Sequence, residues 1–292
     1  MGKTLDEGFK TFLSWIQPLS TEQDKAKTHK DRAYGCLSTN FGCYDLKETG
    51  SFGNGTGVRH YSDTDYFAIC KTDSLSDNSS YTLRKVKEAL QSTFHSTDGV
   101  EVNAPAVKIP LGTYASETME ITPCSFEGMV ETTVGKYPVY SMPNLSGGWM
   151  RSSPQAHNAY VKQHDVRLAG KLKPFIQLVK AWKFNNNVPI RSFYLEMRAT
   201  KWAEAESLIV YDLDLYRFIN HLDSIQLASI TDPLGISGYI YACDTEAKKV
   251  DALSKLKTGL SRATKAYENR EKNIDNAFHW WNMFYNDQFP AR

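Results

Sequence analysis

Hydrophobic residues in the first part of the chain recur at the three- and four-residue spacing of an amphipathic helix. Residues 5–16 follow this spacing, and Pro18 ends the expected helix because proline cannot donate the next backbone hydrogen bond. A second helix is expected from about Ser20, where Ser20 and Gln23 fit a capping box, to about residue 37. The chain therefore opens with two predicted helices.

The pattern then changes to that of β-strands. Residues 66–70 form a continuous apolar and aromatic run, which predicts a buried strand, and a shorter strand is expected at 44–48. An amphipathic helix at 81–94 is expected to cover one side of the sheet. Further strand-like runs follow at 99–102, 106–111 and 118–122.

The second half of the chain is dominated by helical periodicity. Residues 128–148 are rich in Gly, Pro, Ser and Tyr and predict a loop or lid. Ser153 and Pro154 then fit an N-cap followed by proline in the first helical turn. A strand-rich half and a helix-rich half predict an α+β fold with two lobes, residues 1–152 and 153–292, and a cleft between them.

Composition narrows the classes of partner. The 292 residues include 34 Lys and Arg against 33 Asp and Glu, so the formal net charge is only +1, and nucleic acid is not expected as an obligatory partner. The five cysteines form neither a CxxC pair nor a Cys/His cluster with zinc spacing, which predicts reduced thiols and a cytoplasmic protein. No apolar run reaches membrane length, and the charged N-terminal segment does not fit a signal peptide.

Asp63 and Asp65 are the first candidates for chemistry. They stand two residues apart at the start of the predicted strand, so both side chains are expected on one face. Two carboxylates this close repel each other, and a divalent metal ion between them removes the repulsion. The glycine-rich stretch that begins with Gly50 and Ser51 offers backbone N–H groups and a hydroxyl for phosphate.

Three alternative interpretations account for less of this pattern. A surface acidic pair behind a flexible loop would explain Asp63 and Asp65 alone. Residues 50–57 lack the Lys-Ser/Thr ending of a P-loop. A dinucleotide-binding fingerprint does not fit either, because a strand rather than a long helix follows these glycines.

Gly-Ser followed by Asp-x-Asp on a strand resembles the nucleotidyltransferase signature of the polymerase-β-like superfamily. The resemblance implies a third acidic metal ligand on a neighbouring strand. Glu120 fits this role, because the residues on either side of it are apolar and point to the opposite face of the strand. Glu117 is the alternative ligand, and an ordinary exposed glutamate at 120 also stays open. The resemblance further implies two Mg²⁺ or Mn²⁺ ions held by Asp63, Asp65 and Glu120.

The helical half extends the resemblance. Its segments 167–183 and 191–196, together with 147–154 and the Trp-rich 280–290, look like those of the CD-NTases (cGAS/DncV-like nucleotidyltransferases) over most of the chain. Members of this family make cyclic oligonucleotide second messengers in anti-phage (CBASS) defence. The resemblance implies a polymerase-β-like nucleotidyltransferase core with a mixed β-sheet, a C-terminal helical lobe, and an active site in the cleft between.

The resemblance also implicates three residues of the helical half in nucleotide binding. Lys180 would reach the donor triphosphate, Ser192 would hydrogen-bond the same phosphates, and Phe193 would stack on a base. Simpler roles stay open, with Lys180 as an exposed helix cation, Ser192 as a helix cap and Phe193 as a core residue. Tryptophans at helical spacing usually pack in a core. This packing role is expected for Trp182, Trp280 and Trp281.

Two departures from the family pattern matter. Many relatives have a basic residue soon after Gly-Ser, whereas residues 52–56 have none, so neutralising the phosphates falls to Arg59 or to the helical lobe. The zinc-binding insertion through which the animal enzyme senses DNA is missing. We therefore do not expect activation by double-stranded DNA.

The resemblance implies an enzyme that joins NTPs into a cyclic di- or trinucleotide and releases pyrophosphate. Its expected partners are the NTP substrates (ATP, GTP, UTP or CTP), a downstream effector that binds the product, and regulatory proteins of the same operon, with no membrane partner. Two alternatives stay open. One is a nucleotidyltransferase that acts on tRNA, a protein or a small molecule, and the other is a non-catalytic nucleotide-binding module on the same fold.

Overall fold

The computed structural model describes residues 2–18, 20–61, 63–112 and 118–292, with the backbone alone for residues 20–28 and 52. Contacts divide the chain into two compact units. We call them the sheet unit, Pro18–Ala159 with Leu234–Ser237, and the helical unit, Met1–Gln17 with Tyr160–Pro233 and Gly238–Arg292. The first 17 residues thus belong with the second half of the chain, a long-range association that the predicted division after residue 152 did not include.

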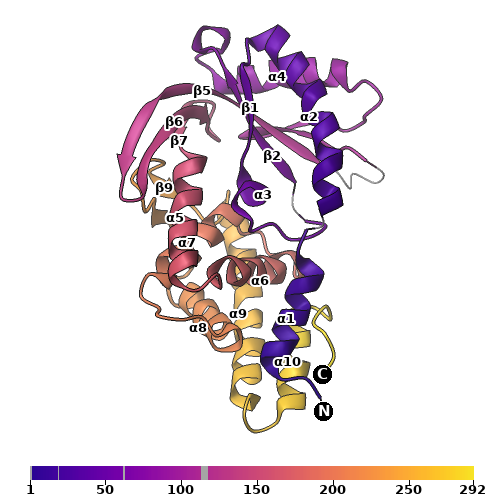
Figure 1. The fold of residues 1–292 in the computed structure, drawn as a ribbon, viewed down its shortest axis with the longest axis vertical. Helices are drawn as coiled ribbons and strands as arrows, with labels where there is room; N and C mark the ends of the chain where they lie inside the picture. The colour runs from indigo at the N-terminus through magenta and orange to yellow at the C-terminus, as the bar shows by residue number, and fades with distance from the viewer. Residues whose placement is uncertain (1, 19, 62, 113–117) are drawn as a thin grey trace. The chain divides into compact units, whose positions relative to one another are not determined.

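A seven-stranded mixed sheet forms the centre of the sheet unit (Figure 1). Its main path has the order β1-β2-β5-β4-β3, in which β2 and β5 are parallel and the other pairs antiparallel. β6 pairs with the later part of β5, and β7 pairs with β6. The strands are β1 (Asp45–Glu48), β2 (Thr64–Cys70), β3 (Glu101–Asn103), β4 (Ala106–Ile109), β5 (Met119–Thr132), β6 (Gly135–Pro143) and β7 (Trp149–Ser152).

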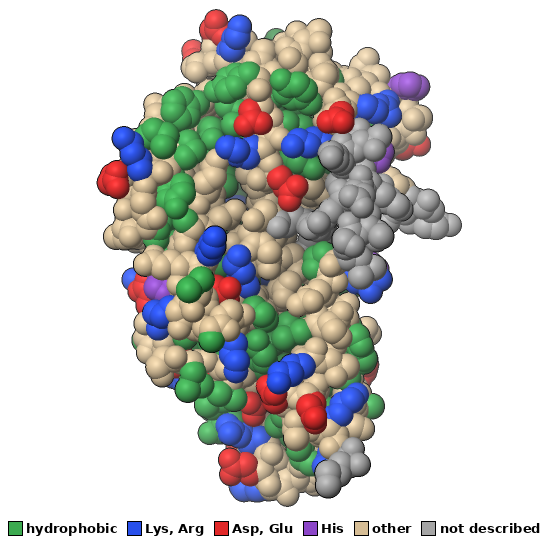
Figure 2. Space-filling view, in the orientation of Figure 1, with side chains coloured by type: hydrophobic (Ala, Val, Ile, Leu, Met, Phe, Trp, Pro, Cys, Tyr) green, Lys and Arg blue, Asp and Glu red, His purple; other side chains and the backbone are tan. Residues whose placement is uncertain are grey.

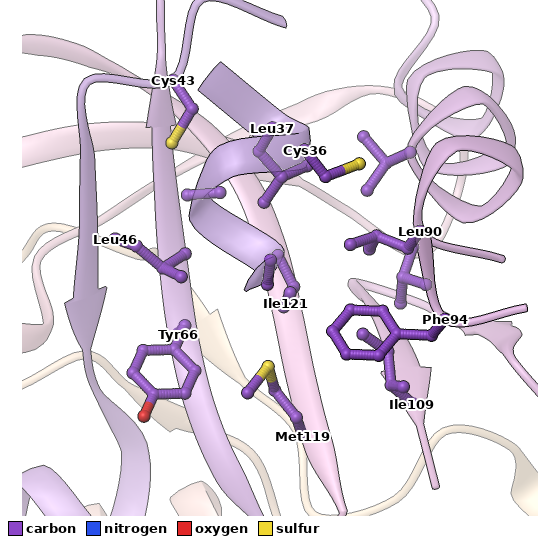
Figure 3. Packing of buried hydrophobic residues seen from close by; sticks show 14 of the residues in the cluster. Cys36, Leu37, Cys43, Leu46, Tyr66, Leu90, Phe94, Ile109, Met119 and Ile121 are labelled. Carbon is purple, nitrogen blue, oxygen red and sulfur yellow. The ribbon is translucent and has the colours of Figure 1, made fainter. Parts of the chain in front are cut away.

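Two helices, α2 (Ser20–Phe41) and α4 (Ser79–Thr93), pack against one face of this sheet. α4 is amphipathic, and Leu83 and Leu90 on its apolar face are buried in the core that it shares with the strands. Tyr66 of β2 lies in the same core, beside Met119 of β5 (Figure 3). The predicted helix over the sheet is therefore confirmed.

Residues 128–148, predicted as a loop or lid, are mostly strand. β5 continues to Thr132, and the antiparallel pairing of Thr132 with Gly135 joins it to β6 in a hairpin. Gly128 lies at a β-bulge with φ +146°, and Gly135 has φ +121°. Glycine adopts such conformations at low cost. The prediction was wrong because these glycines mark a bulge and a hairpin turn within the sheet.

Helices make up most of the helical unit. α5 (Pro154–Arg167) starts in the sheet unit and runs into the helical unit, and its first residue is the proline that the sequence placed there. A two-stranded sheet pairs β8 (Ile230–Thr231) with β9 (Tyr239–Ile240). The other helices of this unit are α1 (Leu5–Ile16), α6 (Leu172–Asn185), α7 (Ser192–Ala203), α8 (Tyr211–Ser224), α9 (Glu246–Asn269) and α10 (Ile274–Phe284).

Aromatic side chains fill the core of the helical unit. Trp182 and Trp281 are buried, which confirms their predicted packing role, whereas Trp280 is partly exposed. α1 adds Phe9, whose ring meets that of Trp281 edge to face at 5.2 Å between centroids. The first helix of the chain is thereby packed against the last, α10.

The distribution of charged side chains agrees with the balanced composition. Figure 2 shows acidic and basic side chains interspersed over the face that it draws. Within the described residues, every helix is either too short or too polar to cross a membrane.

Candidate active site

Asp65 and Glu120 occupy directly opposite positions on two neighbouring strands. The parallel register of β2 and β5 pairs the two residues, and register partners project from the same face of a sheet. Tyr66, which follows Asp65, points into the core beneath α2 and α4, so Asp65 and Glu120 face away from those helices. Asp63 stands two residues before Asp65, just ahead of the strand. Carboxylates thus collect at the start of two adjacent strands.

Charged side chains continue this row across the sheet. Lys108 of β4 pairs in register with Glu120, and Glu101 of β3 pairs with Lys108. Asn103, also on β3, donates a hydrogen bond of 2.9 Å from Nδ2 to Glu120 Oε1. No sequence pattern pointed to Asn103, because its approach to Glu120 depends on the pairing of β3, β4 and β5.

The carboxylates do not form a closed metal-ligand set in this structure. Within the described residues, no three His, Cys, Asp or Glu side chains are gathered closely enough to hold a metal ion. Glu117, the alternative third ligand, lies outside the described residues. The chemistry of the donors nevertheless fits Mg²⁺ or Mn²⁺, because Asp63, Asp65 and Glu120 supply only the hard carboxylate oxygens that these ions prefer.

Gly50 lies directly against Asp65. The backbone N–H of Thr49 donates a hydrogen bond of 2.8 Å to the carbonyl oxygen of Asp65, and Gly50 has φ +63°. A Cβ atom at Gly50 would overlap the carboxylate of Asp65 and come within 2.8 Å of its Cβ. Other residues also take this φ only with strain. Glycine at position 50 therefore leaves the space that the Asp65 carboxylate occupies.

Gly50 begins a short helix, α3 (Gly50–Asn54), at the start of the glycine-rich stretch. Backbone hydrogen bonds from Gly53 N to Thr49 O and from Thr56 N to Ser51 O close its turns. A helix can form in this glycine-rich stretch because glycine weakens a helix by only about 1 kcal/mol. The packing of α3 against β2 offsets this cost. Ser51 is half-buried in its first turn.

The loop between α3 and Asp63 carries Arg59. The side chain is half-buried, and its Nε atom is buried with no hydrogen-bond partner in the described part of the protein. His60 next to it has φ +67°, and Tyr61 N closes the turn on Val58 O at 3.1 Å. A half-buried guanidinium with unused donor capacity is well suited to bind phosphate.

Tyr66 adds no charge beside these groups. Burial, followed by the charges of Glu48 and Asp31, raises the pKa of Tyr66 to about 12. The phenol therefore stays neutral at physiological pH, and the negative charge at the start of β2 comes from the carboxylates.

In the helical unit, Lys180 is buried rather than exposed. Only 1% of its surface is accessible, and its Nζ lies 2.6 Å from Oε1 of Glu196 on α7, which is also buried. This excludes the role of an exposed helix cation. Sequence reasoning missed Glu196, although its position four residues after Ser192 places both on one face of a helix.

Ser192 is hydrogen-bonded to a different lysine. Lys183 Nζ donates to Ser192 Oγ at 2.8 Å and lies 4.4 Å from the ring centre of Phe184. Ser192 is the first residue of α7, and the N-cap is Arg191, so Ser192 is not the cap. Sequence reasoning missed Lys183, because it lies on the same helix as Lys180 and only three residues away.

Phe193 is 39% exposed, whereas Tyr194 and Leu195 after it are fully buried. The core role left open for Phe193 is therefore excluded. This exposed aromatic residue directly follows Ser192 in the chain. An aromatic ring can stack on a base, and a hydroxyl with its lysine partner can bind phosphate.

Comparison with known proteins places the chain in a family. Residues 3–165 match the model of the Second Messenger Oligonucleotide or Dinucleotide Synthetase (SMODS) domain. No curated protein sequence matches the chain.

Solved structures with the same fold include a CdnC of E. coli MS115-1 bound to ATP, with a TM-score of 0.75, 15% identity and 98% of each chain covered. The same protein in a CdnC:HORMA-deltaN complex gives a TM-score of 0.72 over 98% of each chain, again at 15% identity. Vibrio cholerae DncV cyclic AMP-GMP synthase, in complex with the linear intermediate 5′ pppA(3′,5′)pG, gives 0.65 at 14% identity, over 85% of this chain and 70% of that one.

These matches confirm the resemblance to the CD-NTases and the predicted α+β nucleotidyltransferase fold. The family model covers more than half of the chain, including every predicted site residue of the sheet unit. The chain belongs to the family of second messenger oligonucleotide or dinucleotide synthetases, and it is a nucleotidyltransferase.

Proposed function

We propose that this protein joins NTPs into a cyclic di- or trinucleotide second messenger for anti-phage signalling, with release of pyrophosphate. The observation that carries the proposal is the register that pairs Asp65 with Glu120, next to the glycine that makes room for Asp65. These groups have the chemistry that a metal-dependent nucleotidyl transfer needs at one place on a rigid sheet.

Asp63, Asp65 and Glu120 are proposed to hold two Mg²⁺ or Mn²⁺ ions. When bound, the ions lower the pKa of the attacking hydroxyl and neutralise charge on the triphosphate. In the reaction, the ribose hydroxyl would lose its proton to solvent and form a bond to the α-phosphorus, while the bond from the α-phosphorus to the leaving pyrophosphate breaks. The contribution of the protein is to fix the carboxylates on neighbouring strands.

Nucleotide binding is proposed for Gly50 and Ser51 through α3, and for Arg59 through its guanidinium. In the helical unit we propose that Ser192 and its partner Lys183 bind phosphate oxygens and that Phe193 stacks on a base. Lys180 is the family position for a phosphate-binding lysine. To act so here, it would exchange the carboxylate of Glu196 for a phosphate.

A cyclase performs the transfer at least twice, because a linear product must be bound again before its ends are joined. The DncV structure named above contains such a linear intermediate. We propose the same sequence of steps here, with the linear product rebound at the same carboxylates.

Partners and location follow from this chemistry. The substrates are NTPs, so we place the enzyme in the cytoplasm. The solved CdnC complex contains a HORMA protein, and we propose that a regulatory protein of the same operon binds this chain as well. The cyclic product would act on a separate effector protein.

The test is to incubate the purified protein with the four NTPs and Mg²⁺ or Mn²⁺, treat the products with phosphatase, and identify them by mass spectrometry. A phosphatase-resistant oligonucleotide is expected, because a ring has no terminal phosphate. Linear products alone would refute cyclisation. Transfer that occurs only when tRNA, a protein or a small-molecule acceptor is added would show a different nucleotidyltransferase.

A further inference from the structure

Glu120 lies in the middle of a row of residues that crosses the sheet. Asp65 is its register partner on β2, and Lys108 is its partner on β4. All of these side chains leave the sheet on one face, since register partners share a face. The carboxylate of Glu120 can therefore turn toward β2 or toward β4 and β3.

The hydrogen bond from Asn103 shows which way it turns. β3 is separated from β5 by β4, so Asn103 and Glu120 belong to strands about 10 Å apart. A hydrogen bond of 2.9 Å across this gap requires Glu120 to extend toward β3. β2 lies on the opposite side of β5, and the carboxylate is thus turned away from Asp65.

Lys108 would be the obvious partner for Glu120 by charge, because the two are in register. In the described residues, however, Asn103 is the group that donates to the Glu120 carboxylate, and no ion pair joins Glu120 to Lys108. The neutral amide thus holds Glu120 without neutralising it.

Repulsion between carboxylates gives this orientation a physical reason. Without a cation between them, Asp65 and Glu120 are more stable apart than together. The absence of a gathered ligand set among the described residues agrees with this.

We propose that Asn103 is a positioning residue that holds Glu120 away from Asp65 in the metal-free protein, so that binding of a divalent cation must break the Asn103–Glu120 hydrogen bond. The inference rests on the proposed metal site. Asn103 thereby weakens metal binding. The carboxylates of Asp65 and Glu120 are then apart in the metal-free protein and come together when the metal ion binds.

The experiment measures binding of Mn²⁺ alone to the full chain, by the electron paramagnetic resonance signal of the free ion, with no nucleotide present. Asn103→Ala should bind Mn²⁺ roughly three- to tenfold more tightly than the wild type, which is the range expected for loss of one competing hydrogen bond. Val102→Ala is the matched control, because Val102 is on the same strand, exposed, and faces the other side of the sheet. It should leave Mn²⁺ affinity unchanged.

A double-mutant cycle decides the mechanism. In a Glu120→Ala background, Asn103→Ala should have no effect on Mn²⁺ affinity, since the hydrogen bond is already absent. Unchanged or weaker Mn²⁺ binding by Asn103→Ala in the wild-type background would overturn the proposal, and so would an equal gain in the Glu120→Ala background. The Asp65→Asn variant tests the proposed metal site separately from the role of Asn103. Unchanged Mn²⁺ binding by Asp65→Asn would refute the metal site itself.

Discussion

The ammonium group of Lys180 lies 2.6 Å from a carboxylate oxygen of Glu196, and the two side chains are buried together in the helical unit. Burial of two charges is tolerated because each compensates the other. Removal of one partner leaves an uncompensated buried charge, which costs about 3–5 kcal/mol. The pair therefore links the stability of α6 and α7 to Lys180, a residue that we propose as a phosphate-binding lysine.

We expect Glu196→Gln to lower the free energy of unfolding by about 3–5 kcal/mol, as measured by urea denaturation. The double variant Lys180→Met with Glu196→Leu is the control, because it removes both charges and keeps apolar volume. Its stability should be close to that of the wild type. A Glu196→Gln protein as stable as the wild type would show that the ion pair contributes little.

Gly50→Ala should abolish most of the synthesis activity. The new Cβ atom would overlap the Asp65 carboxylate, and φ +63° adds strain of about 1–2 kcal/mol. Gly53→Ala is the matched control in the same helix, because a Cβ there has its nearest neighbour at 3.5 Å and φ is not positive. Product formation from NTPs is the measurement. Equal activity of the two variants would contradict the close approach of Gly50 to Asp65.

The double variant Asp63→Asn with Asp65→Asn should lose synthesis while its thermal midpoint stays the same or rises. Carboxylates that repel each other do not stabilise a metal-free fold, but their loss removes the proposed metal ligands. Differential scanning calorimetry and a pyrophosphate-release assay measure the two effects. Glu101→Gln, an exposed carboxylate on the same sheet, should leave both unchanged. Turnover by the double variant would place the metal site elsewhere.

Phe193→Ala should raise KM for NTP by about 5- to 150-fold, which corresponds to the 1–3 kcal/mol of base–aromatic stacking. Its stability should change little, because the ring is 39% exposed. Phe193→Tyr should retain affinity, since a stacking surface tolerates a hydroxyl. NTP titrations alongside chemical denaturation test this. A stable Phe193→Ala protein with unchanged KM would remove Phe193 from the site.

Lys183→Met should raise KM for NTP at least about tenfold, because a charge-assisted hydrogen bond contributes roughly 1.5–3 kcal/mol. Lys201→Met is the control, since Lys201 is an exposed lysine of α7 whose ammonium pairs with Glu204 at 2.7 Å. Steady-state kinetics at varied NTP concentration measure both variants, and the KM of Lys201→Met should equal that of the wild type. An unaffected KM in Lys183→Met would return the role of phosphate-binding lysine to Lys180.

Local patterns predicted the elements that carry the carboxylates. Alternation along a strand is a property of a few adjacent residues, so Asp65 and the face of Glu120 followed from the sequence alone. The β5–β6 hairpin could not be predicted in this way, because glycine is common both at bulges within strands and in loops. Likewise, Lys180 and Lys183 are three residues apart on α6, and packing rather than spacing decides which of them is buried.

The hydrogen bond between Asn103 and Glu120 could not be predicted from the sequence for a different reason. It depends on the order β5-β4-β3, which is a property of how strands pair over long separations. The association of α1 with α6, α8 and α10 is of the same kind. An apolar face on a helix indicates that the helix packs against another element, but it does not identify that element.

That association of α1 bears on the order in which the chain folds. The sheet unit is almost continuous in sequence, whereas the helical unit needs both Met1–Gln17 and the final helix α10. On the ribosome, the residues of the sheet unit emerge before α10 exists, so the sheet can form while α1 still lacks the surface that buries Phe9. Although α1 precedes the sheet unit in the sequence, it can pack in the helical unit only after α10 has been made.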